Sequence, residues 1–185
     1  MKKLCLALLA CTTLGTTFNT LADSNHTVSL GYAQSKLETG PTLKGVNAKY
    51  RYEWDSPISI ITSLTYMARG VNGIYDDDGS IGKSKLDFKY WSFSAGPAYR
   101  FNEFISIYSL LGYNANSVKL NDISNSHDSL TYKGRSFMYG AGILINPMDK
   151  LSLELGYEGS SLKYDEFSHK RLAINGFNVG IGYRF

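Results

Sequence analysis

This sequence has few cysteines, a small net charge and few long hydrophobic runs. The 185 residues include two cysteines, Cys5 and Cys11, and both lie near the N-terminus. A secreted domain without these two residues cannot depend on a disulfide framework. The net charge of +3 gives no basic excess for binding nucleic acid. Beyond the N-terminus, no segment approaches the roughly 20 apolar residues that a membrane-spanning helix requires.

The N-terminus has the features of a secretory signal peptide. Lys2 and Lys3 precede an apolar-to-small run, and Thr20-Leu21-Ala22 resembles a cleavage site. We therefore expect residues 1–22 to be cleaved and residues 23–185 to form one outer-membrane domain. Removing Lys2 and Lys3 lowers the 19 Lys and Arg to 17, against 16 Asp and Glu. Two alternatives are an uncleaved anchor, which the Thr-rich second half disfavours, and a lipoprotein signal before Cys11, whose apolar run is very short.

Strict alternation of apolar with small or polar residues runs through the expected mature chain. The C-terminal segment 175–185 has apolar residues at every odd position from Phe177 to Phe185. Such alternation predicts β-strands with one apolar face and one polar face. The expected strands are 27–34, 44–54, 58–67, 91–101, 104–113, 135–146, 151–160 and 173–185. Segment 104–113 is apolar in both phases, so its two faces stay unassigned.

Eight such strands predict an all-β fold, an eight-stranded antiparallel transmembrane β-barrel. Short periplasmic turns are expected at 55–57, 102–103 and 146–150, and four longer extracellular loops at 35–43, 68–86, 114–134 and 164–171. A lipocalin-like barrel would place its apolar face inside. Here the bulky aromatic face suits lipid and the smaller charged face suits a narrow interior. The last strand must pair with the first, because an open edge in lipid leaves backbone groups unsatisfied.

Several segments resemble the enterobacterial OmpX/Ail/PagC/Rck/Lom family. They are "GYAQSK" (31–36), "GVNAKYRYE" (45–53), "AGPAYR" (95–100), "YGAGILINPM" (139–148), "LGYEGS" (155–160) and "GFNVGIGYRF" (176–185). The endings are most similar to the PagC and Rck branch, and the match fails only in the long loops. The resemblance implies an outer-membrane barrel whose loops serve attachment, invasion, complement resistance or survival in phagocytes. The C-terminal pattern also resembles an outer-membrane assembly signal, formed here by Phe177, Val179, Ile181, Tyr183 and Phe185.

Charged residues fall on the face that we expect to line the interior. They are Lys49, Arg51, Glu53, Arg100, Glu154, Glu158 and Arg184. An eight-stranded barrel is just wide enough to be filled by side chains. Buried charges there must be paired, because an unpaired one costs several kcal/mol. We therefore expect an ion-pair network that acts as the core, in preference to a conducting pore.

Two groups of residues are expected at the outer surface. Apolar residues in the longest loops are candidate contacts to a host protein: Ile74, Tyr75, Leu120, Ile123 and Leu130. Basic residues near the loop-bearing ends are candidate lipopolysaccharide contacts: Lys44, Lys85, Lys133, Arg135, Lys170 and Arg171. Ordinary solvated strand tips are the alternative for the basic group. Together with the family resemblance, these groups imply outer-membrane lipid and lipopolysaccharide as partners, and host matrix or complement-regulatory proteins as further ones. We expect a monomer that does not bind nucleic acid.

Signals for catalysis or metal binding are weak. "DDDGS" (76–80) lacks the Gly and Glu that an EF-hand loop needs at its sixth and twelfth positions. "SHDS" (126–129) places Ser, His and Asp side by side, whereas a triad arises from converging segments. We expect no enzyme activity, no metal and no cofactor. The sequence does not separate a virulence-associated interaction protein from a general envelope barrel without a host ligand.

Overall fold

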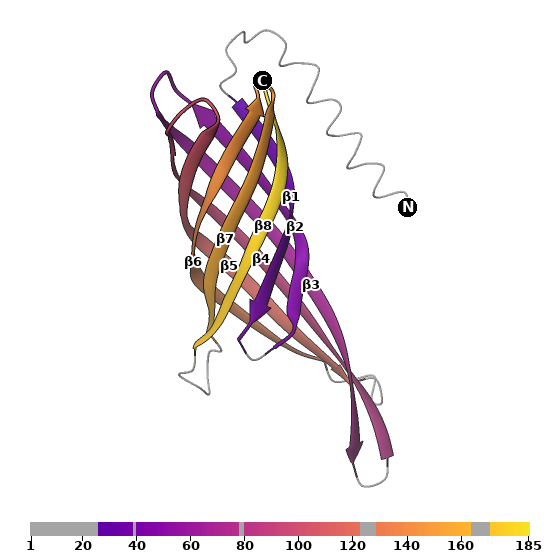
Figure 1. Ribbon diagram of the computed structural model, residues 1–185. Coiled ribbons are helices and arrows are strands. Elements are labelled where there is room, and N and C mark those ends of the chain that lie inside the picture. Colours follow the sequence, from indigo (N-terminus) through magenta and orange to yellow (C-terminus); the bar gives the residue numbers. More distant parts are fainter. Residues whose placement is uncertain (1–25, 39, 78–79, 123–128, 164–170) are drawn as a thin grey trace.

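The computed structural model is a closed antiparallel β-barrel of eight strands (Figure 1). It describes residues 26–38, 40–77, 80–122, 129–163 and 171–185. The strands are β1 (His26–Leu37), β2 (Thr42–Glu53), β3 (Ile58–Asp77), β4 (Ser80–Arg100), β5 (Ile105–Asp122), β6 (Ser129–Met148), β7 (Leu151–Lys163) and β8 (Arg171–Arg184). Within the described ranges, no helix is long and apolar enough to cross a membrane. The predicted signal peptide and its cleavage site lie outside these ranges.

The first and last strands close the barrel, as the C-terminal pattern predicts. β8 pairs with β1 over eleven residues, from Thr27↔Arg184 to Leu37↔Ile174. At the periplasmic end of this seam, the backbones of His26 and Phe185 exchange two hydrogen bonds of 3.1 and 2.9 Å. The His26 ring also stacks on the Phe185 ring, with centroids 5.8 Å apart. The terminal residue is therefore fixed at the seam.

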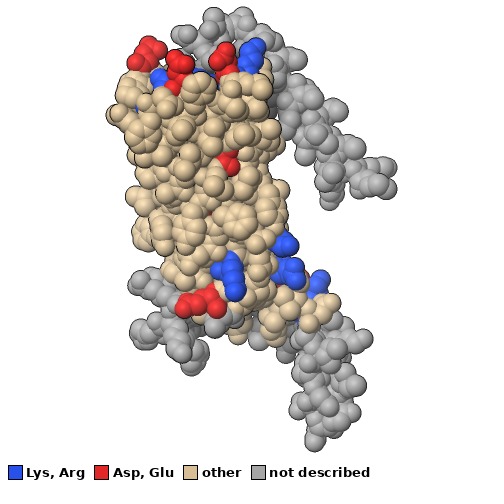
Figure 2. All heavy atoms as spheres, in the orientation of Figure 1, with Lys and Arg blue, Asp and Glu red and all other residues tan. Residues whose placement is uncertain are grey.

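The two faces of the sheet follow the predicted alternation. Even positions of β2, such as Val46 and Tyr50, are exposed outward, whereas Asn47, Lys49 and Arg51 are buried inside. Charged residues concentrate at the two ends of the barrel, and the band between them is almost entirely uncharged (Figure 2). An outward apolar band between charged rims is the surface of a barrel that sits in a bilayer.

The strand with ambiguous phase, β5, turns out to be apolar on both faces. Ile107 and Leu111 are exposed to the outside, whereas Tyr108 and Leu110 are buried. These two inward residues join Ile61, Ala98 and Leu144 in one apolar cluster. The interior therefore contains apolar packing as well as charges, which the expectation of a purely ionic core omitted.

The strands differ in length between two sides of the barrel. β3 to β6 have 18 to 21 residues and form what we call the tall half. β7, β8, β1 and β2 have 12 to 14 residues and form the short half. In Figure 1 the hairpin of β3 and β4 extends far beyond the other strands at the end opposite the C-terminus. We call this end extracellular, because the short turns and the C-terminus lie at the other.

The tall half corrects the expected boundaries of two loops. Most of 68–86 and much of 114–134 continue as paired strands, with β3 joined to β4 as far as Asp77↔Ser80 and β5 to β6 as far as Asn121↔Ser129. Beyond the membrane both strand faces meet water, so alternation of apolar residues no longer marks a strand. Asp78-Gly79 stands between β3 and β4, and Asp-Gly is typical of two-residue hairpin connections.

Candidate functional site

The periplasmic end of the interior holds a cluster of charges around Glu53. Its carboxylate lies 2.9 Å from Arg51 Nη2, 3.5 Å from Arg100 Nη1 and 3.2 Å from Arg184 Nε. Arg51 also donates hydrogen bonds to Ser59 and Ser106. Arg100 and Arg184 are partly exposed, whereas Glu53 and Arg51 are buried. Water therefore screens the outer part of this cluster and not its centre.

A second, fully buried cluster lies deeper in the barrel around Lys49. The Lys49 ammonium donates to Glu154 at 2.9 Å, Asn178 at 2.6 Å and Asn47 at 2.7 Å. Three donors and three acceptors match, and the Lys49–Glu154 pair is only 1% exposed on each side. Glu158, the other acid here, accepts hydrogen bonds from Asn178 and Thr65. The predicted interior charges thus form two clusters. Hydroxyl groups of Ser59 and Ser106 extend the first, and asparagine and threonine side chains extend the second; sequence reasoning missed both sets.

Apolar packing fills the rest of the interior. At the extracellular mouth, Leu37, Leu43, Met67, Tyr90 and Ile174 form a cluster together with Ala33. Deeper in, Gly142 and Gly156 make room for Tyr108, because a Cβ atom on either glycine would lie 2.4 or 2.3 Å from the tyrosine hydroxyl. The glycines at these two positions therefore allow tight packing of the Tyr108 ring against the sheet. Such an interior has the filled character of a core.

Outward-facing aromatic rings form a belt at each end of the apolar band. Near the short turns, Tyr52 contacts Trp54 and Tyr99 contacts Phe101, with ring centroids 5.3 and 5.2 Å apart. Near the extracellular end, Tyr66 lies 5.2 Å from Trp91 and Tyr113 lies 4.6 Å from Phe137. Trp and Tyr prefer the headgroup level of a bilayer. The two belts therefore mark the two membrane surfaces.

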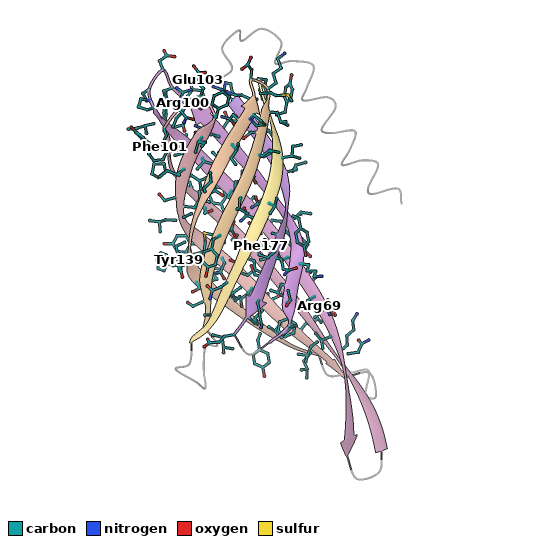
Figure 3. All side chains as sticks on the ribbon, viewed as in Figure 1. Arg69, Arg100, Phe101, Glu103, Tyr139 and Phe177 are labelled. Carbon is teal, nitrogen blue, oxygen red and sulfur yellow. The ribbon has the colours of Figure 1, made fainter. Side chains whose placement is uncertain are left out.

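Basic side chains cluster just beyond the extracellular belt. Of the predicted lipopolysaccharide contacts, Lys44, Lys133 and Arg135 are exposed on the outer wall, and Lys85 lies 3.6 Å from Asp87. Lys170 lies outside the described residues, and Arg171 is described only as the first residue of β8. Sequence reasoning did not include Arg69 and Lys119, which are also exposed at this end; Figure 3 labels Arg69 at the base of the hairpin.

The predicted host-contact residues fall on the tall half. Ile74 and Tyr75 lie in the part of the β3–β4 hairpin beyond Ala68, the last β3 residue that pairs with β2. We call this part of the hairpin the overhang. Leu120 pairs with Leu130 at the ends of β5 and β6. Leu120 is partly buried, whereas the side chains of Ile74, Tyr75 and Leu130 are not among those described. Ile123 lies outside the described residues. Ile74, Tyr75, Leu120 and Leu130 therefore belong to paired strands and not to irregular loops.

The described residues contain no cluster of His, Cys, Asp or Glu that could hold a metal ion. His26 stands at the periplasmic seam and accepts or donates a 2.8 Å hydrogen bond with Tyr50. The "SHDS" segment (126–129) and the "DDDGS" segment (76–80) lie where side chains are not described. The described residues therefore form a membrane barrel whose longer strands, β3 to β6, extend beyond the others on the extracellular side.

Comparison with known proteins connects this architecture to a family. The protein-family model described as "Enterobacterial Ail/Lom protein" matches this chain over residues 1–185. The chain belongs to this family. It is 38% identical over its full length to the virulence membrane protein PagC of Salmonella typhimurium, with 100% of both chains covered. It is also 41% identical to the attachment invasion locus protein of Yersinia enterocolitica, over 64% of this chain and 68% of that one.

A solved structure supports the same assignment. Ail of Yersinia pestis, crystallised with the heparin analogue sucrose octasulfate, is 32% identical and superimposes with a TM-score of 0.71. The alignment covers 87% of this chain and 98% of that chain. Membership in the Ail/Lom family and the closed barrel identify the chain as a virulence-associated protein of the bacterial outer membrane. The predicted resemblance, fold and location are confirmed.

Proposed function

We propose that this Ail/Lom protein attaches the bacterium to host cells through the overhang of its tall half. The observation that carries the proposal is an unpaired strand edge. β3 pairs with β2 only as far as Lys44↔Ala68, whereas it pairs with β4 up to Asp77↔Ser80. Within the described part of the chain, the outer edge of β3 from Arg69 to Asp77 therefore has no partner strand.

An exposed strand edge is a template for an extended segment of another protein. Its backbone N–H and C=O groups can bind a partner strand, and alternate side chains supply specificity. Ile74 and Tyr75 lie on this edge strand and would provide apolar contacts. Host matrix proteins and complement regulators are the partner classes that fit a surface-exposed edge, and the relatives named for virulence, attachment and invasion support this choice.

A second ligand class, sulfated host polysaccharide, is favoured by exposed cations at the base of the overhang. Arg69, Lys85 and Lys119 are all exposed there. The crystallised Ail from Yersinia pestis held a heparin analogue. Sulfate groups would bind these cations by charge-assisted hydrogen bonds. The proposal assigns no catalytic role to the protein and treats the closed barrel as a monomer.

Truncating the overhang in register tests the proposal. Replacing residues 72–85 by Asn-Gly would keep the Val71↔Leu86 pair and supply a two-residue turn. Replacing 121–129 by Asn-Gly, which keeps Leu120↔Leu130, is the matched control on the same half. We expect the first variant to lose attachment to cultured host cells at least ~10-fold and the second to lose less, at equal surface expression.

Competition with free heparin separates the two ligand classes. Attachment that depends on the overhang but resists heparin indicates strand addition to a protein. Loss with heparin and with Arg69→Gln, Lys85→Gln and Lys119→Gln together indicates sulfated polysaccharide. Unchanged attachment by the 72–85 variant would contradict the proposal and favour an envelope barrel without a host ligand.

A further inference from the structure

The periplasmic mouth of the barrel interior has three guanidinium groups around one carboxylate, and a buried amide donor on the same inward face. We propose that this mouth binds a phosphate group from the periplasmic solution, held by Arg100 and by the side-chain amide of Asn146. Inorganic phosphate and small phosphate monoesters share the chemistry that the site requires. The mouth is at the opposite end of the barrel from the overhang, so this proposal is independent of host attachment.

Arg100 is the cation of this cluster with the most donor capacity to offer a ligand. Its guanidinium lies 3.5 Å from the Glu53 carboxylate, whereas a charge-assisted N–H···O contact is typically about 2.7–2.9 Å. Glu53 is closer to Arg51, at 2.9 Å, and to Arg184, at 3.2 Å. The Arg100 side chain is also 30% exposed, and a guanidinium has several N–H donors. Arg100 can therefore keep its contact with Glu53 and bind a second anion.

Asn146 supplies a buried donor at the same end of the interior. Its Nδ2 has no hydrogen-bond partner among the described residues, and the residue is only 5% exposed. The register of β6 against β7 shifts between Ile145 and Met148, so Asn146 has no register partner on β7. Such irregularities commonly re-aim a side chain at the rim of a barrel. Because a buried N–H without an acceptor is costly, an acceptor from solution would stabilise this position.

Strand register places Arg100 and Asn146 on the two sides of one buried hydroxyl group. Ser106 on β5 lies opposite Arg100 on β4 and opposite Leu144 on β6. Asn146 is two residues beyond Leu144, and its backbone N–H donates to the Phe104 carbonyl group at 2.8 Å. Diagonal neighbours on one sheet face remain within reach of long side chains. A phosphate group over Ser106 would therefore be within reach of both donors.

The direction of these side chains decides where the ligand comes from. Arg100 and Asn146 are on the interior face, whereas Tyr99 and Phe101 beside Arg100 are exposed on the outer wall and belong to the aromatic belt. Figure 3 labels Arg100 and Phe101 at the end of the barrel with the short turns. A phosphate group presents oxygens in several directions, so it can accept from a guanidinium on one side and an amide on the other.

The side-chain amide of Asn146 can report on the site directly. The isotopically labelled protein, folded in micelles of a non-ionic detergent, would be titrated with inorganic phosphate while the Asn146 side-chain N–H signals are recorded by nuclear magnetic resonance. Parallel titrations would use glycerol 3-phosphate, and sodium chloride at equal ionic strength. Phosphatidylglycerol added to the same micelles tests a lipid headgroup as the source of the phosphate.

Four variants separate the site from the general charge of the rim. Arg100→Gln and Asn146→Ala each remove one of the two proposed donors. Lys150→Gln and Glu103→Gln change exposed charges on the neighbouring turns and are the matched controls. Because Asn146→Ala removes the reporter, phosphate binding by all variants is measured by isothermal titration calorimetry. Circular dichroism first checks that each variant keeps its strand content.

We expect inorganic phosphate and glycerol 3-phosphate to shift the Asn146 amide signals in a saturable way. Arg100→Gln should weaken phosphate binding by about 10- to 100-fold, because it removes hydrogen bonds between charged groups. Asn146→Ala should weaken it by about 3- to 10-fold. The two controls should stay within about 3-fold, because water and salt screen exposed charges.

Three results would overturn the proposal. The first is an Asn146 signal that does not saturate with phosphate, or that responds equally to sodium chloride. The second is a shift with phosphatidylglycerol that soluble phosphate neither reproduces nor reverses, which would assign the site to a lipid headgroup. The third is a loss of binding in Lys150→Gln as large as that in Arg100→Gln, which would mean that the rim attracts anions without a defined site.

Discussion

The short and tall halves of the barrel differ in what they place inside. Nearly all the interior charges come from the short half: Lys49, Arg51 and Glu53 on β2, Glu154 and Glu158 on β7, and Arg184 on β8, with Arg100 on β4 as the exception. The deep apolar cluster of Ile61, Ala98, Tyr108, Leu110 and Leu144 comes entirely from the tall half.

This difference indicates that one side of the barrel can stabilise the fold while the other side binds partners outside the cell. Buried charges fix the pairing of the short strands, which end near the membrane surface. The tall half packs on apolar and tyrosine side chains and projects its longer strands outward. If this division is correct, interior changes on the short half should affect stability most, and overhang changes should affect binding.

The largest expected effect is that of Lys49→Met on the short half. It would leave Glu154 and Glu158 buried without their cation, so the free energy of unfolding should fall by about 3–5 kcal/mol. The measurement is urea-induced unfolding of the protein in lipid vesicles. Lys36→Met, an exposed lysine on β1, is the matched control and should change stability by less than ~0.5 kcal/mol.

Adding Glu154→Gln to Lys49→Met checks the cause. If the loss comes from an uncompensated acid, the double variant should be less destabilised than the sum of the two single changes by about 1–3 kcal/mol. Strict additivity, or a loss below ~1 kcal/mol for Lys49→Met alone, would show that the buried pair does not hold the short half.

A smaller effect is expected from Gly142→Ala on β6. The new Cβ atom would lie 2.4 Å from the Tyr108 ring and 2.5 Å from the Leu155 carbonyl oxygen, so overpacking should cost about 1–3 kcal/mol. Gly140→Ala, two residues away, meets its nearest atom at 3.0 Å and should cost less. The same unfolding experiment compares them, and the reverse order would contradict the proposed packing of Tyr108.

The smallest effect is expected from Arg100→Gln at the periplasmic rim. The Arg100 side chain is 30% exposed and lies 3.5 Å from the Glu53 carboxylate. Because Glu53 would still have Arg51 and Arg184 as partners, the free energy of unfolding should fall by less than ~1 kcal/mol. Glu53→Gln should cost more, because buried Arg51 would lose its carboxylate partner. Equal losses from the two changes would mean that water does not screen the outer part of this cluster.

The sequence predicted the membrane part of the fold because alternation reports on two different environments. Lipid outside and a filled interior select opposite residues at every step, so the faces of β2, β7 and β8 could be assigned. β5 could not, because its inward Tyr108 and Leu110 meet apolar neighbours from the same half. Which residues Tyr108 and Leu110 contact depends on tertiary packing, so the sequence of β5 shows no alternation that would distinguish its two faces.

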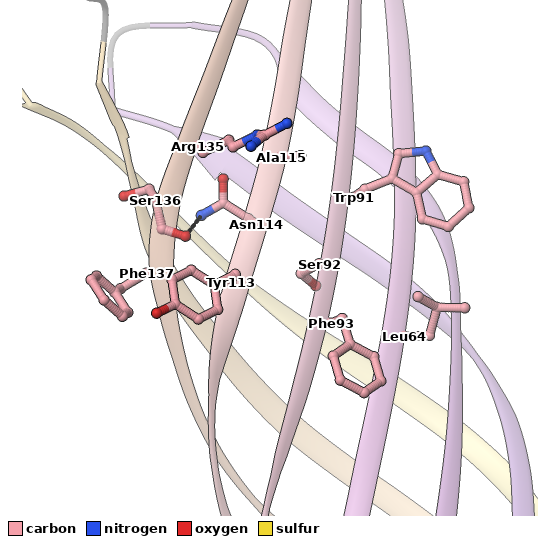
Figure 4. A pocket seen from close by; sticks show the side chains of 10 residues that line it. All are labelled: Leu64, Trp91, Ser92, Phe93, Tyr113, Asn114, Ala115, Arg135, Ser136 and Phe137. Carbon is pink, nitrogen blue, oxygen red and sulfur yellow. Dashed lines mark hydrogen bonds between the residues drawn. The ribbon is translucent and has the colours of Figure 1, made fainter.

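The outer surface was predicted less well for a related reason. Beyond the membrane, both faces of β3 and β4 are in water, so the strands were interpreted as loops. The predicted cations at Lys133 and Arg135 do lie on the outer wall, but the sequence did not indicate the groove beside Arg135, which side chains from neighbouring strands line (Figure 4). Cross-strand register, which brings Trp91, Ala115 and Arg135 into one row, is visible only in the folded barrel.

The most direct test of this division measures stability and attachment on one variant, with residues 72–85 replaced by Asn-Gly. Our account predicts that its free energy of unfolding stays within ~1 kcal/mol of the parent protein, while attachment to host cells falls at least ~10-fold. Undiminished attachment, or a barrel that unfolds with the loss of the overhang, would contradict the assignment of contact to the tall half and of stability to the short half.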